Sequence, residues 1–397
     1  MEEQRVGLAD LARAFLKLGA MSYGGPAIMG IMQAELQEKR GWVSKEKFLE
    51  GLALVNMLPG PGATQLGIFV GYELAGWLGG LVAGLCFILP AFFIMLALAL
   101  LYSSYGAMPE MRGAFYGLGP VVLGIFIVAV YRLGRNALKG TVQVLLALTA
   151  AAAVAWSPLG IATILLLAGC AGVALYHSKR QGTIAAAAVL GLFTALHAAY
   201  GLHEAVTDAV AAPAAQGLWD IGTFFFKVGA FTFGGGLTML AFVQDQVVNQ
   251  LNWLTPQEFL DGLALGQLTP GPILMLAAYV GYKVAGLAGA TVGGIAIFLP
   301  SFMLMLSVMP VLGRLRHLLW IKAAMRGIGA AAIGAIGVSL LQMAPYAAPD
   351  AFAVFLLALT VAAMLAWRAG PLPLMLGGAC IGAASRLNPL RRLKDLV

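Results

Sequence analysis

Two copies of one apolar pattern occur in this chain, and the repeat constrains the fold more than any other feature. FLEGLALVNMLPGP at 48–61 matches FLDGLALGQLTPGP at 259–272, and FLKLGAMSYGGP at 15–26 matches FFKVGAFTFGGG at 225–236. The offset between the copies is 210 or 211 residues throughout. Such ordered self-similarity predicts two homologous halves that bury their apolar faces against each other.

Composition assigns both copies to a membrane. The chain is 61% hydrophobic and 10% charged, whereas soluble domains carry about 25% charged residues. Several apolar runs are long enough, or nearly so, to cross a hydrocarbon core of about 30 Å. These runs are 80–101, 114–131, 141–156 and 159–176. We therefore predict an all-α polytopic protein of the bacterial inner (plasma) membrane, with the lipid bilayer as its surroundings and no nucleic-acid partner.

Basic residues between the apolar segments predict that the copies run in opposite directions through the bilayer. In each of three matched pairs of segments, one member has three or four Lys and Arg residues and the other has one or none. The pairs are 35–50 with 245–261, 311–326 with 102–113, and 132–139 with 343–350. The positive-inside rule then orients the copies oppositely. Inverted repeats around a midplane site are typical of secondary transporters.

The same charges predict segments that enter and leave the membrane by one face. Phe48–Leu58 would extend only about 16 Å as a helix, half of a bilayer, before its Gly and Pro residues. We predict an N-terminal repeat over 1–200 with a cytoplasmic N-terminus, an extracytoplasmic linker over 201–217, and an inverted repeat over 218–397. The predicted re-entrant hairpins are 8–39, 48–73, 218–250 and 256–283. Kinked spanning helices are the alternative, and the side of the C-terminus stays open.

Each predicted hairpin is interrupted by Gly and Pro, and the interruptions suggest a binding site near the midplane. Broken helices within a bilayer are tolerated where they line protein or a wet cavity. A helix that begins at such a break offers free N–H groups and a partial positive charge to an anion. The glycines could instead allow close helix packing. The candidate anion-binding residues at the breaks are Ser22, Gly24, Gly25, Asn56, Pro59, Gly60, Pro61, Gly62, Thr64, Gln65, Thr232, Gly234, Gly235, Gln267, Thr269 and Gly271.

Three pairs of charged residues occupy equivalent positions in the two copies: Lys17 with Lys227, Glu50 with Asp261, and Glu73 with Lys283. The lysines interrupt apolar helices and have no carboxylate beside them in sequence, so we expect the anion to be their partner. Snorkelling to the interface is the alternative. The carboxylates of the second pair are candidates for proton coupling, or else solvated helix ends. Opposite charge in the third pair argues against a shared role.

With both copies in view, the chain resembles the chromate ion transporter (CHR) family in its long two-domain form. The resemblance rests on SYGGP at 22–26 with TFGGG at 232–236, and on PGP at 59–61 and 270–272. LP pairs at 89–90 and 299–300 extend it. It implies two homologous domains of opposite orientation and export of chromate from the cytoplasm, with sulfate as a related oxyanion.

We therefore predict a secondary transporter that exports chromate by alternating access, without a cofactor or a bound metal. A dianion that leaves an inside-negative cell gains about 4.6 kcal/mol per 100 mV, so export needs no ATP. The sequence has no Walker A motif. Alternatives are a transporter of sulfate or another oxyanion and an anion channel. An enzyme would need a nucleophile or a cluster of carboxylates and histidines, which the sequence lacks. Proton coupling and a homodimer stay open.

Overall fold

The computed structural model describes residues 6–23, 27–106, 108–157, 159–207, 217–233, 236–311 and 319–387. These residues form helices and connecting segments, without a strand among them. Four helical segments are long and apolar enough to cross a membrane. They are α4 (Gly62–Tyr105), α5 (Pro109–Ala137), Ile273–Val308 and α14 (Leu319–Ala347). The prediction of an all-α polytopic membrane protein is confirmed.

The order of helices is the same in both copies. The first copy contains α1 (Leu8–Met21), α2 (Ala27–Gln33), the π-helix η1 (Ala34–Lys39), α3 (Lys45–Val55), α4, α5, α6 (Thr141–Trp156) and α7 (Ile161–Tyr176). The second contains α9 (Leu218–Ala230), α10 (Thr238–Val243), the π-helix η3 (Gln244–Gln250), α11 (Pro256–Leu268), η4 (Ile273–Met275), α12 (Leu276–Val308), η5 (Met309–Val311), α14, α15 (Ala351–Ala366) and α16 (Pro371–Leu387). The repeat therefore extends beyond the matched sequence motifs to the last helices of each copy.

Helices α4 and α12 each consist of two arms that fold back on each other at an Ala-Gly pair. Gly76 has φ 63° and ψ −151°, and Gly286 has φ 60° and ψ −147°. Glycine adopts this left-handed conformation without a steric penalty. Beyond the turn the arms lie so close that a Cβ atom on Gly71 would overlap the backbone of Gly79. Residues eight positions apart in a straight helix would be about 12 Å apart.

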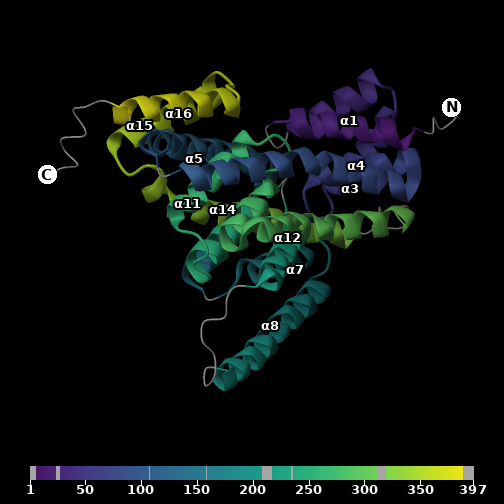
Figure 1. The fold of residues 1–397 in the computed structure, drawn as a ribbon. Helices are drawn as coiled ribbons and strands as arrows, with labels where there is room; N and C mark the ends of the chain where they lie inside the picture. The colour runs from purple at the N-terminus through teal and green to yellow at the C-terminus, as the bar shows by residue number, and fades with distance from the viewer. Residues whose placement is uncertain are drawn as a thin grey trace.

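The two copies interlock. The arms of α4 pack against α12, and α5 packs against α14. Helices α15 and α16 of the second copy lie on α5 of the first, and α6 and α7 of the first lie on α14 of the second (Figure 1). Glycines allow this close approach, since a Cβ atom on Gly117 or Gly327 would overlap the opposing backbone. The apolar core is therefore shared between the copies.

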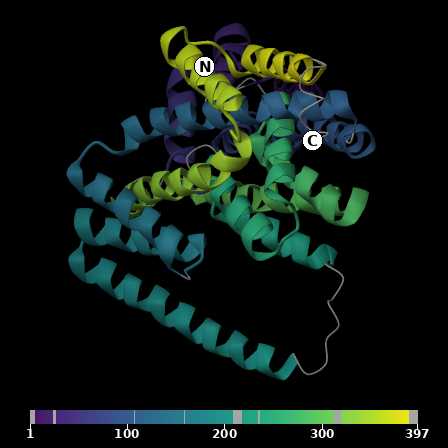
Figure 2. The same cartoon turned by 90° about the vertical axis from the view of Figure 1, so that its left-hand side faces the viewer.

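Helix α8 (Lys179–Thr207) has no counterpart among the described helices. It packs on α7 and extends away from the rest of the molecule (Figure 1, Figure 2). The predicted linker over 201–217 begins as the end of this helix, and residues 208–216 lie outside the described part of the chain.

Candidate functional site

The breaks of the two copies are joined by a reciprocal pair of hydrogen bonds. The Gly60 N–H donates to the Thr232 carbonyl (2.6 Å), and the Gly271 N–H donates to the Ser22 carbonyl (2.7 Å). We call residues 56–61 and 269–272 the first and second PGP breaks. Gly60 and Gly271 have φ values of 128° and 93°, which favour glycine. Each PGP break is thus bonded to the glycine-rich break of the opposite copy.

The chain reverses direction at the PGP breaks. A Cβ atom on Gly51 in α3 would meet the ring of Phe69 in the first arm of α4. In the second copy, the Tyr279 hydroxyl of α12 donates to the Glu258 carbonyl of α11 (3.0 Å). The two segments on either side of each PGP break therefore lie antiparallel. The depth of these hairpins in a bilayer stays a prediction.

Buried polar atoms without hydrogen-bond partners are concentrated at the first PGP break. Thr64 Oγ1, Gln65 Oε1 and Ser301 Oγ bond to no described residue, and their side chains are almost completely buried. Gln65 Nε2 donates to the Pro59 carbonyl (2.6 Å). A Cβ atom on Gly60 would meet both Gln65 and Ser301, so these side chains surround the break. Leaving a buried polar group unpaired costs about 1–3 kcal/mol, which indicates a ligand or water there.

The helix that starts at this break adds backbone donors. Pro61 precedes α4, and the N–H groups of Gly62, Ala63 and Thr64 donate to no backbone carbonyl of a described residue. The first turn of a helix leaves these groups without intrahelical acceptors and carries a partial positive charge. Hydroxyl and N–H donors at a helix N-terminus are suited to an oxyanion.

The second PGP break is apolar where the first is polar. Leu274 and Met275 occupy the positions after PGP, and both are buried. The Thr269 hydroxyl donates to the Leu265 carbonyl (2.8 Å), and the Thr232 hydroxyl donates to the Val228 carbonyl (2.6 Å), so both are satisfied within their own helices.

The remaining predicted residues are dispersed. The Ser22 hydroxyl is buried without a partner among the described residues, beside the second PGP break rather than the first. Gln267 is half-buried on α11, whereas Asn56 is exposed at the end of α3. The predicted Gly24, Gly25, Gly234 and Gly235 lie outside the described residues.

The two lysines lie on exposed faces of α1 and α9. Lys17 pairs with a carboxylate that is distant in the sequence, because its Nζ lies 3.7 Å from Glu35 Oε1. Glu35 also pairs with Lys39 and Arg40. A straight helix would separate residues 17 and 35 by about 27 Å, so this contact shows that α1 and η1 lie side by side. Contact between an anion and Lys17 or Lys227 stays a prediction, and this exposure lends it no support.

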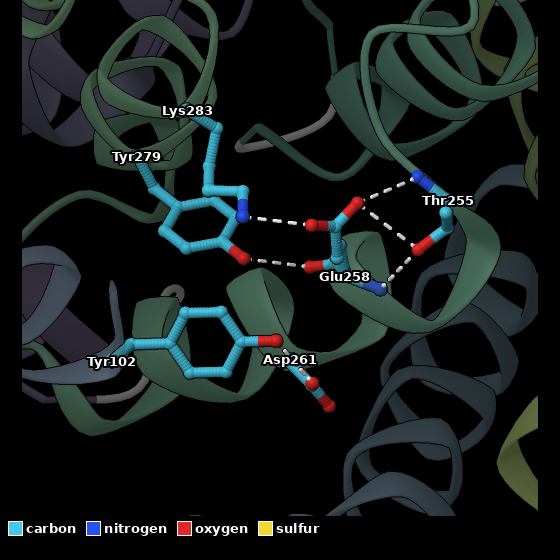
Figure 3. A network of polar contacts seen from close by, with 6 residues as sticks. All are labelled: Tyr102, Thr255, Glu258, Asp261, Tyr279 and Lys283. Atoms are coloured by element: carbon cyan, nitrogen blue, oxygen red, sulfur yellow. Dashed lines mark hydrogen bonds and ion pairs between the residues drawn. The ribbon is translucent and has the colours of Figure 1, made fainter. Parts of the chain in front are cut away.

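Asp261 lies in a polar network that joins the copies (Figure 3). Its buried carboxylate accepts hydrogen bonds from the Tyr102 hydroxyl of the first copy (2.7 Å) and from Gln257 Nε2 (2.9 Å). Glu258, one turn earlier, pairs with Lys283 Nζ (2.7 Å). Glu50, the counterpart of Asp261, is half-exposed on α3. The environments of the two candidate proton carriers therefore differ, although their sequence positions are equivalent.

Equivalent ion pairs close the two hairpins at the ends opposite the PGP breaks. Lys47 pairs with Glu73 (2.9 Å) in the first copy, and Glu258 pairs with Lys283 (2.7 Å) in the second. Each pair joins the start of one antiparallel segment to the end of the other. The cation comes first in the chain in the first copy, and the acid comes first in the second. Glu73 and Lys283 therefore hold equivalent structural positions, since the charge of each partner is reversed as well.

Sequence reasoning missed several residues of these arrangements. Ser301 replaces an alanine of the first copy in IFLPSF, so a polar side chain in an apolar run was its signal. Glu35 lies among the basic residues that set the topology, where its sign separates it from its neighbours. Tyr102 ends a long apolar run and carries no comparable signal.

Antiparallel half-helices whose breaks meet inside a bundle of long apolar helices define a membrane transport protein of the broken-helix class. The chromate transporter family model matches residues 9–175 and 219–383. The chain therefore belongs to the chromate transporter family. The two matched blocks coincide with the two copies and omit α8.

Curated relatives cover nearly the whole chain. A chromate transport protein of Cupriavidus metallidurans is 34% identical over 94% of this chain and 92% of its own length. A probable chromate transport protein of Synechococcus elongatus is 33% identical, with 94% of each protein covered. An uncharacterized transporter of Methanocaldococcus jannaschii is 28% identical over 78% of this chain and 77% of its own length. No solved structure matches the chain. These names point to a transporter rather than an enzyme.

Proposed function

We propose that the protein exports chromate, or a closely related tetrahedral oxyanion, from the cytoplasm by alternating access. The observation that carries the proposal is the pair of unpartnered buried hydroxyls of Thr64 and Ser301 beside the N-terminus of α4. Chromate itself comes from the names of the relatives and from the family. Chromate and sulfate have the same charge and shape, so this donor set would accept both.

The donors at the first PGP break suit a carrier because they are neutral. Hydroxyl and backbone N–H groups replace part of the hydration shell of an anion without a formal positive charge. A buried lysine or arginine would hold a dianion more tightly and slow its release. The bound N–H groups of Gly60 and Gly271 are engaged in bonds between the copies, so these glycines would shape the site rather than contact the anion.

Different packing of the two copies supports alternating access. Helix α11 packs against α5 and α14, and α10 also packs against α14, whereas the main contact of α3 is with α4. Correspondingly, α10 is wholly buried while α2 is only partly so. Inverted copies with different packing are expected of a carrier that is closed on one side and open on the other. If each copy adopted the packing of the other, the opening would move to the other face of the membrane.

Outward movement follows from the membrane potential, since a dianion gains about 4.6 kcal/mol per 100 mV on leaving an inside-negative cell. The positive-inside rule favours the basic segment 35–50 on the cytoplasmic side, which makes the loosely packed first copy the open side. Asp261, buried between the copies, is the better of the two candidates for proton coupling.

Chromate uptake into inside-out vesicles tests the proposal. We expect Thr64→Val to reduce uptake about tenfold or more, since it removes a buried hydroxyl that could donate to the anion. Thr232→Val is the matched control, because its hydroxyl already bonds within α9, and it should transport at close to the normal rate. A purified protein that binds none of chromate, sulfate, phosphate and chloride would refute the proposal. Competition between these anions identifies the preferred substrate.

A further inference from the structure

Two cavities of similar size lie at equivalent places in the two copies. One, of about 680 Å³, is lined by Tyr102, Arg112, Tyr116 and Tyr346. The other, of about 610 Å³, is lined by Asn136, Lys139, Lys322 and Arg326. Lys322 is the counterpart of Arg112, Arg326 of Tyr116, and Asn136 of Tyr346, all at an offset of 210 residues. We call them the balanced cavity and the basic cavity.

The cavities differ in charge. In the balanced cavity, Arg112 and Lys283 are matched by the carboxylates of Asp261 and Asp350. The basic cavity has Lys139, Lys322 and Arg326 on its lining, and none of its described lining residues carries a carboxylate. None of these three cations forms an ion pair with a residue that the structure describes. Three uncompensated cations around one cavity produce a positive potential that attracts an anion.

The cavities also differ in how far they reach. The basic cavity is lined by Asn56 and Met57, which belong to the first PGP break. The balanced cavity reaches α11 only at Gln257 and Asp261, near the start of that helix and far from the second PGP break. The basic cavity therefore reaches the first residues of the break that precedes Thr64 and Gln65, whereas the described lining of its counterpart includes no residue of the second PGP break.

We propose that the basic cavity is an anion-binding vestibule that collects a divalent tetrahedral oxyanion and delivers it to the first PGP break. The proposal rests on the function proposed above and adds a second binding site to it. Lys139, Lys322 and Arg326 raise the local concentration of the anion, and the amides of Asn56 and Asn136 supply hydrogen bonds. The balanced cavity attracts the anion less, so loading is favoured on one side and release on the other.

Initial rates of chromate uptake into inside-out vesicles, measured against chromate concentration and salt, test the vestibule. We expect Lys322→Gln with Arg326→Gln to raise KM about threefold to tenfold, to leave the maximal rate within about twofold, and to flatten the dependence on ionic strength. Lys322→Arg with Arg326→Lys retains the charge and should restore KM. This conservative variant keeps the test valid if the glutamine variant folds poorly.

Two controls separate the vestibule from the effect of loop charge on topology. Arg112→Gln removes the counterpart of Lys322 from the balanced cavity. Lys45→Gln removes a positive charge from the predicted cytoplasmic face outside either cavity. Both should leave KM and its salt dependence unchanged. If the glutamine double variant also leaves them unchanged in active vesicles, the vestibule is refuted while the proposed function stands. If the wild type transports no oxyanion, the proposed function itself fails.

Discussion

The two copies share the order of their α-helices but differ in the side chains at their breaks. Both contain a π-helical turn, a hairpin turn at an Ala-Gly pair, and a PGP break bonded to the opposite copy. Yet the residues of the second copy that correspond to Thr64 and Gln65 are apolar, and the residue of the first copy that corresponds to Ser301 is Ala91. A symmetric scaffold therefore supports one polar site rather than two.

The packing of the two copies also differs. The hairpin with α11 is buried against α5 and α14, whereas α3 leaves Asn56 exposed to a cavity. Equivalent sequences thus adopt different environments because the helices around them are arranged differently. The comparison teaches that repeat symmetry predicts the backbone, while the position of a single site requires the side chains and the contacts between copies.

The largest effect is expected at the reciprocal glycines. Gly60→Ala and Gly271→Ala each introduce a Cβ atom at a left-handed φ and against a close neighbour. We expect each substitution to reduce transport more than a hundredfold. We expect the Tm in detergent to fall equally in the two variants. A well-tolerated Gly271→Ala would show that only the first break requires a glycine, since alanine retains the backbone N–H group.

A cross-link should stop transport without unfolding the protein. In a variant that lacks Cys86, Cys170 and Cys380, Asn56→Cys and Met325→Cys provide two thiols on the lining of the basic cavity. Joining them with a short bifunctional reagent should hold α3 against α14 and abolish uptake by a carrier. The same variant without reagent is the control, and persistent flux after cross-linking would favour a channel.

Exchanging Ser301 with its counterpart tests the asymmetry of the site. Ser301→Ala should weaken chromate binding about tenfold, since a hydrogen bond to a charged ligand contributes about 1.5–3 kcal/mol. Ala91→Ser adds a hydroxyl at the equivalent place in the first copy and should leave binding unchanged. Titration of the purified variants measures both. Equal effects of the two substitutions would contradict a site confined to the first PGP break.

The smallest effect is expected for the exchanged ion pairs. Lys47→Glu alone places a second carboxylate beside Glu73 and should reduce the free energy of unfolding by about 1 kcal/mol. Adding Glu73→Lys reproduces the charge order of the second copy and should restore stability to within about 0.5 kcal/mol. Thermal denaturation in detergent measures the difference. A double variant less stable than Lys47→Glu would show that the two pairs are not equivalent.

Much of the fold could be predicted because its signals are local. The apolar runs, the PGP breaks and the glycine at the hairpin turn each reside in a few consecutive residues, where backbone preference and hydropathy act. The candidate site was predicted less completely. Thr64 and Gln65 were predicted from their place at a break. The hydroxyls of Thr232 and Thr269 also lie at breaks in the sequence, but in the structure they bond to carbonyls of their own segments.

The class of protein, the two copies and the positions of the breaks follow from the amino-acid sequence alone, because hydrophobic burial and backbone freedom are properties of short segments. Tertiary structure decided which break is polar, how Lys17 pairs with Glu35, and which cavity keeps its positive charge. These outcomes depend on contacts between residues far apart in the chain. Hydrogen bonds and charges act over a few ångströms, so only the packed arrangement of the two copies establishes them.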